Sequence, residues 1–186
     1  MILNIKNMVC NRCITAVCKI LDSINCTIIK ISLGEVKIKE QLTQDKLQIL
    51  SEKLKDEGFE LLLDKNDKII EKIKNLIVDL VHYTSQPLNI KLSVFLADKM
   101  NKDYKYLSSL FSQNQNKTIE RFFIEQKIER IKELLQNNKL NLSEIAYKMG
   151  YSSSAYLSNQ FKKITGVSPS QYKKENINDR KPLDMV

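Results

Sequence analysis

The sequence predicts an α+β protein in which a small βαββαβ domain precedes an all-α domain. Over residues 1–64, polar and apolar residues alternate at the spacing of two that half-buried strands require, with two helical segments between them. From residue 65 onward the apolar residues recur at helical spacing, and a pattern of about 20 residues occurs twice. We therefore expect domains over residues 1–64 and 65–174, followed by a polar tail over 175–186 that frays.

The first domain is expected to run in the order strand, helix, strand, strand, helix, strand. The strands are predicted at Met1–Lys6, Thr27–Ser32, Glu35–Lys39 and Phe59–Leu63. The second helix covers about Thr43–Glu57, carries leucines at helical spacing and stops at Gly58. Four strands and two helices in this order are the elements of a small ferredoxin-like sandwich.

The all-α domain begins after a short polar junction, Asp64–Asp67. An apolar stripe from Ile69 to Val81 predicts a helix that ends near His82. This stripe either packs as the first helix of the all-α domain or pairs two subunits in a homodimer. His82 is the only histidine of the chain, and we expect it to have a structural role.

The stretch from Asn141 to Tyr172 predicts two helices joined by a glycine turn. Asn141 and Glu144 have the three-residue spacing of a capping box, and Gly150 then interrupts the apolar pattern. A second, amphipathic helix starts among residues Ser152 to Ser154 and is expected to bury Leu157, Phe161 and Ile164. A short helix, a turn and an amphipathic helix together are the parts of a helix-turn-helix unit.

The same arrangement occurs about 50 residues earlier, from Leu92 to Phe111. The equivalent pairs are Ala97 and Ala146, Asn101 and Gly150, Leu107 and Leu157, and Phe111 and Phe161. Asparagine suits the turn because it tolerates the left-handed backbone conformation better than most side chains. A predicted helix over Thr118–Gln136 joins the two helix-turn-helix units, and its inward-facing residues are expected to be Ile119, Phe122, Ile128, Ile131 and Leu135. Two units on one rigid spacer can enter two successive major grooves of double-stranded DNA, about 34 Å apart.

The second helix of each unit leaves small, polar or cationic residues on the face opposite its apolar residues. These residues are Lys102, Lys105, Ser108 and Ser109 in the first unit, and Ser154, Ala155, Ser158, Asn159 and Lys162 in the second. Small hydrogen-bonding side chains let a helix approach base edges closely, and long cationic side chains reach phosphates. The two faces are therefore the predicted DNA-binding site.

Residues Leu92 to Lys174 resemble the DNA-binding domain of the AraC-type bacterial transcriptional regulators. The segment EIAYKMGYSSSAYLSNQFKKITGVSPSQY carries the signature of that family. The resemblance implies base contacts by Lys105, Ser108 and Ser109 in the first unit and by Ser154, Ala155 and Ser158 in the second. Asn159 stands where many members have arginine, and the first unit lacks the turn glycine.

The net charge of +8 lies entirely in the second part of the chain. Residues 1–64 carry nine basic and nine acidic side chains, whereas residues 65–186 carry 21 basic and 13 acidic ones. Such a local excess is typical of proteins with a polyanionic partner, because lysine and arginine release the counterions condensed on phosphates. With no secretory signal and no apolar run long enough to cross a membrane, a cytoplasmic protein is expected. The sequence also lacks catalytic motifs, so no enzymatic activity is expected.

Cys10 and Cys13 lie three residues apart in the segment NMVCNRC, before the first predicted helix. The segment resembles the loop of the heavy-metal-associated domains of copper chaperones and metal-pumping ATPases, although Asn7 replaces the usual glycine. A helix N-terminus is expected to lower the pKa of Cys13, and two thiolates suit Cu(I) or another soft metal ion, whereas zinc needs more ligands. Cys18 and Cys26 are expected in the core. A redox pair, or a fold that has lost its metal function, would also explain the two cysteines.

Two functions are consistent with these features. The first is a sequence-specific DNA-binding transcriptional regulator whose first domain senses a metal ion or pairs subunits. The alternative is a metal-carrying, chaperone-like protein that its second domain anchors to nucleic acid. Operator binding that depends on Cys10 and Cys13 would favour the regulator, and ion exchange with a partner pump would favour the chaperone.

Overall fold

The computed structural model describes residues 1–84, 88–175, 179–184 and 186. The chain divides into two compact units, Met1–Asn75 and Leu76–Val186. Among the described residues, no helix is both long enough and apolar enough to span a bilayer.

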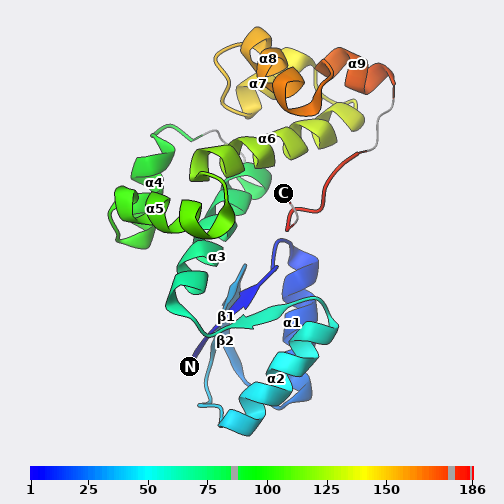
Figure 1. Cartoon of the computed structure of the whole chain (residues 1–186). Coiled ribbons are helices and arrows are strands. Elements are labelled where there is room, and N and C mark those ends of the chain that lie inside the picture. Colours follow the sequence, from blue (N-terminus) through cyan, green and yellow to red (C-terminus); the bar gives the residue numbers. More distant parts are fainter. Residues whose placement is uncertain (85–87, 176–178, 185) are drawn as a thin grey trace. The chain divides into compact units, whose positions relative to one another are not determined.

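The first unit is a four-stranded antiparallel sheet with two helices on one face (Figure 1). Its elements are β1 (Ile2–Lys6), α1 (Asn11–Ser23), β2 (Ile28–Ser32), β3 (Glu35–Ile38), α2 (Gln44–Asp56) and β4 (Glu60–Leu62). The strand order is β2-β3-β1-β4, so the first strand lies in the interior of the sheet between β3 and β4. This order and the βαββαβ sequence of elements confirm the predicted ferredoxin-like α+β fold.

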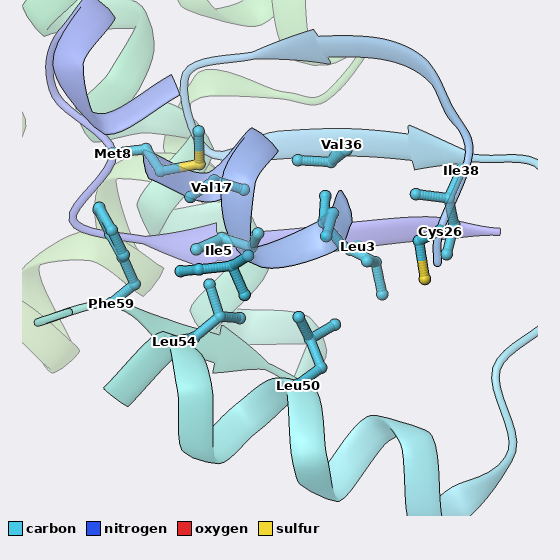
Figure 2. Packing of buried hydrophobic residues seen from close by; sticks show 12 residues of the cluster. Leu3, Ile5, Met8, Val17, Cys26, Val36, Ile38, Leu50, Leu54 and Phe59 are labelled. Carbon is cyan, nitrogen blue, oxygen red and sulfur yellow. The ribbon is translucent and has the colours of Figure 1, made fainter. Parts of the chain in front are cut away.

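The core of this unit lies between the sheet and the helices (Figure 2). Alternate residues of β1 and β3 point toward the helices, as the period of two requires. The buried side chains include Leu3 and Ile5 of β1, Val36 and Ile38 of β3, Val17 of α1, and Leu50 and Leu54 of α2. Met8 and Cys26 are buried in the same cluster, which confirms the core position expected for Cys26. The core position expected for Cys18 is wrong, because this residue follows the buried Val17 on α1, points away from the cluster and is only half-buried.

Helix α3 (Lys65–Val78) begins where the first domain was expected to end, and it continues into a π-helical turn, η1 (Asp79–Tyr83). The first compact unit extends along α3 as far as Asn75, and α3 contacts the loop at Asn7 and the turn at Gly34. The Asn7 backbone N–H donates a hydrogen bond to Glu71 Oε1 (3.1 Å). A Cβ atom on Gly34 would lie 2.0 Å from Asn75 Nδ2, so this turn requires glycine.

The apolar stripe of α3 is packed within the single chain. Ile73 and Ile77 are fully buried, and Ile70 is 4% exposed. A stripe buried in this way does not offer a free surface for pairing two subunits. The stripe thus packs within the chain, but not wholly as the first helix of the all-α domain, because its residues up to Asn75 belong to the first compact unit.

The second unit is built around one long helix, α6 (Ile119–Gln136). The other helices are α4 (Leu92–Met100), α5 (Tyr104–Gln115), α7 (Leu142–Lys148), α8 (Ser154–Thr165) and α9 (Pro169–Lys174). The α4–α5 pair and the α7–α8 pair lie toward opposite ends of α6 (Figure 1). The apolar residues predicted to face inward from α6 are all buried: Ile119, Phe122, Ile128, Ile131 and Leu135. The predicted spacer helix between the two helix-turn-helix units is thereby confirmed.

Candidate nucleic-acid interface and cysteine loop

The two helix-turn-helix units, α4–α5 and α7–α8, share the same backbone details. Both turns contain a left-handed residue, Asn101 (φ 50°) in the first and Gly150 (φ 67°) in the second. The next helix then begins at an N-cap residue whose side chain accepts backbone hydrogen bonds, Asp103 before α5 and Ser153 before α8. The prediction that Asn101 takes the left-handed conformation of a turn glycine is therefore confirmed.

The apolar faces of α5 and α8 fix both helices against their neighbours. Leu107 and Phe111 of α5 and their counterparts Leu157 and Phe161 of α8 are buried. The Phe111 ring packs against Phe122 of α6, with centroids 5.8 Å apart. The Phe161 ring meets Tyr172 of α9 edge-on at 5.4 Å. Both second helices are thus held on one side, which leaves the opposite side to solvent.

Most of the predicted DNA-binding residues lie on these open faces. In α8, Ala155, Asn159 and Lys162 are exposed, while Ser154 and Ser158 are half-buried. The Ser158 hydroxyl donates to the Ser154 carbonyl oxygen (2.8 Å).

The equivalent face of α5 has the same pattern. Lys105 and Ser109 are exposed, and Ser108 is half-buried. In the part of the chain that the structure describes, neither Lys105 nor Lys162 forms an ion pair. Both ammonium groups are therefore available to an external anion.

Lys102 was expected on the face of the second helix, and that placement is wrong. The helix is capped by Asp103, whose carboxylate accepts the N–H groups of Lys105 and Tyr106. Because the cap lies one residue after Lys102, Lys102 belongs to the turn. Its ammonium group lies over the Tyr106 ring, 5.6 Å from the centroid.

Sequence reasoning missed one pair of residues, Tyr106 and Tyr156. Each is the third residue of its helix, and their exposed fractions are 46% and 54%. The offset of 50 residues that relates Leu107 to Leu157 also relates these two tyrosines, so the repeat could have revealed them. An exposed aromatic ring beside polar side chains suits contact with a sugar or a thymine methyl group.

The two cysteines of the NMVCNRC segment converge at the start of α1. Cys10 is the N-cap residue, Cys13 lies in the first turn, and their Sγ atoms are 3.3 Å apart. Both are half-buried and reduced, whereas Met8 points into the core and is fully buried. The Sγ atoms of Cys10 and Cys13 are therefore partly accessible in the loop, whereas the sulfur atom of Met8 is not.

The helix N-terminus was expected to lower the pKa of Cys13, but it is the pKa of Cys10 that is lowered. Burial by itself would raise the pKa of Cys10, but hydrogen bonds from the backbone N–H and the thiol of Cys13 and from the Arg12 N–H lower it. Burial raises the pKa of Cys13, contrary to the expectation that it would be lowered. The reason is position, because Cys10 caps the helix while Cys13 is already part of it.

The cysteine loop is anchored at its start by Asn7. This residue has a left-handed backbone (φ 70°), a conformation that usually calls for glycine. Its side-chain amide donates to the Gly58 carbonyl oxygen (3.0 Å), and its backbone N–H donates to Glu71 of α3. The asparagine thus meets the same backbone demand as glycine and adds a hydrogen bond.

His82 has the structural role that was expected. It is 8% exposed in η1, and its Nε2 lies 3.0 Å from Gln126 Oε1 of α6. Burial lowers the pKa of His82 to about 4, so the ring is neutral at physiological pH.

Residues 96–175 match the helix-turn-helix domain family. The Msm operon regulatory protein of Streptococcus mutans is 34% identical over 84 residues, which are 45% of this chain and 30% of that protein. The xylose operon regulatory protein of Haemophilus influenzae is 29% identical over 99 residues, 53% of this chain and 26% of that protein. The chain therefore spans less than a third of the length of either relative.

Solved structures resemble the same region. The C-terminal domain of AraT, a response regulator from Geobacillus stearothermophilus, superposes with a TM-score of 0.52 and 28% identity, covering 63% of this chain and 94% of that chain. A transcriptional regulator with an AraC-type DNA-binding domain from Chromobacterium violaceum has the same fold, with a TM-score of 0.52, 17% identity and coverage of 61% and 96%. Residues 96–175 of this chain therefore match the helix-turn-helix domain family, and they share the fold of the AraC-type DNA-binding domain of the Chromobacterium violaceum protein.

Proposed function

We propose that this chain is a sequence-specific transcriptional regulator that binds double-stranded DNA with α5 and α8 in two successive major grooves. The observation that carries the proposal is the pair of equivalent helices on one spacer, each with an open face of small, polar and cationic residues. The basic excess of residues 65–186 supports it, because a cationic domain gains affinity for DNA by counterion release. One chain holds both units, so a monomer suffices for two half-sites, and a homodimer would read four.

Selection from a randomised duplex library with the full chain tests this function. We expect enrichment of one sequence, and a footprint with two protected segments about one helical turn apart. Reversing the charge of both open faces, with Lys105→Glu and Lys162→Glu, should abolish binding. The matched control, Lys39→Glu with Lys55→Glu, makes the same change of charge in the compact unit Met1–Asn75, outside the helix-turn-helix domain. This variant should retain most of the affinity. Failure of the full chain to enrich any sequence would overturn the proposal.

We further propose that the regulator responds to a soft metal ion, such as Cu(I), held by Cys10 and Cys13. The Sγ separation of 3.3 Å supports the proposal, because both thiolates need to move little to share one ion. Two sulfur ligands suit Cu(I), whereas zinc prefers four ligands. Among the described residues, no group of three or more cysteine, histidine or acidic side chains is gathered as a metal site.

The link between the cysteine loop and α3 supports a role of the metal in regulation. A metal ion regulates DNA binding only if it binds the DNA-competent state with a different affinity. The hydrogen bond from Asn7 to Glu71 joins the loop to the helix that continues past Asn75 into the second unit. A shift of the loop on metal binding would therefore act directly on that helix.

The test measures Cu(I) uptake by competition with a chromophoric chelator, and the affinity for the selected duplex with and without Cu(I). The variant Cys10→Ser with Cys13→Ser should lose both the uptake and the effect of Cu(I) on DNA binding. Cys18→Ser, a half-buried cysteine elsewhere on α1, is the control and should keep both. Unchanged uptake in the double variant would show that the ion binds elsewhere, and the metal proposal would fail.

A further inference from the structure

Helix α6 buries polar and charged side chains in addition to its apolar stripe. Gln126 is fully buried, and Glu129 and Lys132 are each 4% exposed. The three residues are spaced by three, so they follow one another along the same side of the helix. Glu129 and Lys132 form an ion pair with each other (3.0 Å), and the remaining hydrogen-bonding atoms on this side of α6 are satisfied by the segment that covers it.

The covering segment is Asp179–Leu183, which we call the strap. It runs antiparallel to α6, because higher strap numbers pair with lower helix numbers (Figure 1). The Lys132 ammonium group pairs with Asp179 Oδ1 (3.1 Å), and the Lys181 N–H donates to Glu129 Oε2 (3.0 Å). This region was expected to fray as a polar tail, and its described residues instead lie against the helix.

Asp179 connects the strap to two helices. Besides Lys132 of α6, its Oδ1 atom accepts a hydrogen bond from the Tyr172 hydroxyl of α9 (3.0 Å). Tyr172 is 1% exposed and packs edge-on against Phe161 of α8. Burial opposes ionisation of Asp179, but the hydrogen bonds from Lys132 and Tyr172 hold its pKa below the usual range. A single carboxylate thus ties α6 to α9, and α9 in turn packs through Tyr172 against α8 of the second helix-turn-helix unit.

The other end of the strap reaches the middle of α6. The Gln126 amide donates to the Leu183 carbonyl oxygen (3.0 Å) and uses its oxygen for His82. Since that amide nitrogen must donate to a carbonyl, its oxygen can only accept, and the His82 proton therefore lies on Nε2. Gln126 joins the strap, α6 and η1 in one buried network.

We propose that the strap is a positioning element for DNA binding, which fixes the second helix-turn-helix unit on α6 and so sets the half-site spacing that the domain accepts. This inference rests on the proposed DNA-binding function. Adding or removing one base pair turns one half-site by about 34° relative to the other, since one turn contains 10 to 10.5 base pairs. A rigid domain cannot follow that rotation, whereas a domain without the strap can follow it in part.

The experiment compares the selected duplex with duplexes that have one base pair inserted or removed between the half-sites. For the full chain, mis-spacing should cost about 100-fold in affinity, because one of two linked contacts is lost. For Asp179→Ala, which removes both links of the carboxylate, the cost should fall to about 10-fold or less. Binding to an isolated half-site should remain within about twofold of the full chain, a readout that general destabilisation would not spare. Asp184→Ala removes an exposed carboxylate just beyond the strap and is the control.

A second variant, a chain that ends at Glu175, removes the whole strap and should relax the spacing preference further. If the shortened chain loses its cooperative thermal transition, Asp179→Ala decides the question alone. The same mis-spacing cost in Asp179→Ala as in the full chain would overturn the strap proposal while the DNA-binding function stands. Failure of the full chain to select any duplex would overturn both.

Discussion

Asn101 and Gly150 hold the same left-handed backbone conformation at equivalent points of the two turns. Asn101 has φ 50° and ψ 45°, and Gly150 has φ 67°. In both turns a backbone N–H just after the first helix donates to the equivalent alanine, since Lys102 donates to Ala97 and Tyr151 to Ala146. Two different residues therefore meet one geometric demand.

This equivalence predicts that substitution destabilises the protein at Gly150 but has almost no effect at Asn101. Gly150→Ala should lower the free energy of unfolding by about 1–2 kcal/mol, because a Cβ atom is strained at positive φ. Asn101→Gly should change it by less than about 0.5 kcal/mol, because glycine takes the same conformation freely. Urea unfolding measures both, with Ser152→Ala as a neutral control. An unchanged midpoint for Gly150→Ala would contradict the left-handed turn.

The caps of α5 and α8 provide a second prediction. Ser153→Ala should cost about 1 kcal/mol of stability, because it removes the acceptor of the Tyr156 N–H. Asp103→Ala should cost a similar amount, whereas Asp103→Ser should keep the cap and stay within about 0.5 kcal/mol. Asp103→Ser also removes a negative charge beside the predicted DNA-binding face, so it should tighten DNA binding at low salt. Equal stability of Asp103→Ala and Asp103→Ser would show that the cap contributes nothing.

The open face of α8 predicts a division between phosphate and base contacts. Lys162→Ala should weaken binding to all duplexes by a similar factor and lower the slope of log affinity against log salt by about one. Lys163→Ala makes the same change of charge one residue along the helix, outside the predicted face, and should change the slope less. Ser158→Arg should instead change which half-site sequence is preferred. If Ser158→Arg weakened all duplexes equally, the assignment of the base-reading face would be wrong.

Local features of the fold could be predicted from the sequence. The capping box is present, since Asn141 and Glu144 each accept the backbone N–H of the other at 3.0 and 2.7 Å. Its two members are three residues apart, so spacing alone reveals it. The same holds for the inward residues of α6 and for the repeat that relates α5 to α8.

Features that depend on distant partners could not be predicted. The buried Lys132 pairs with Glu129 in its own helix and also with Asp179, 47 residues away, and the local pattern of α6 does not predict this second partner. Ile164 was expected to be buried on the apolar side of α8 but is half-buried, since helical period does not say what covers a helix end. The pKa of Cys10 is lowered and that of Cys13 is not, because α1 begins just after Cys10. The sequence pattern does not fix the first residue of a helix to within one position, so it could not tell the two cysteines apart.

The buried His82 makes the stability of the second unit depend on pH. The pKa of His82 is about 4 in the folded chain and about 6.5 in an unfolded chain, so between these values only the unfolded state takes up the proton. The effect disappears as the pH rises above 6.5 and destabilises the fold as the pH falls, by about 2 kcal/mol at pH 5 and about 3 kcal/mol near pH 4. His82→Gln cannot take up this proton, so its free energy of unfolding should fall by about 2 kcal/mol less than that of the unmodified chain between pH 7.5 and pH 5. Urea unfolding at the two pH values measures the difference, and the comparison cancels the titration of the carboxylates.

Because His82 is the only histidine, its imidazole NMR signal is unambiguous, and a folded-state pKa near 6.5 would contradict the burial argument.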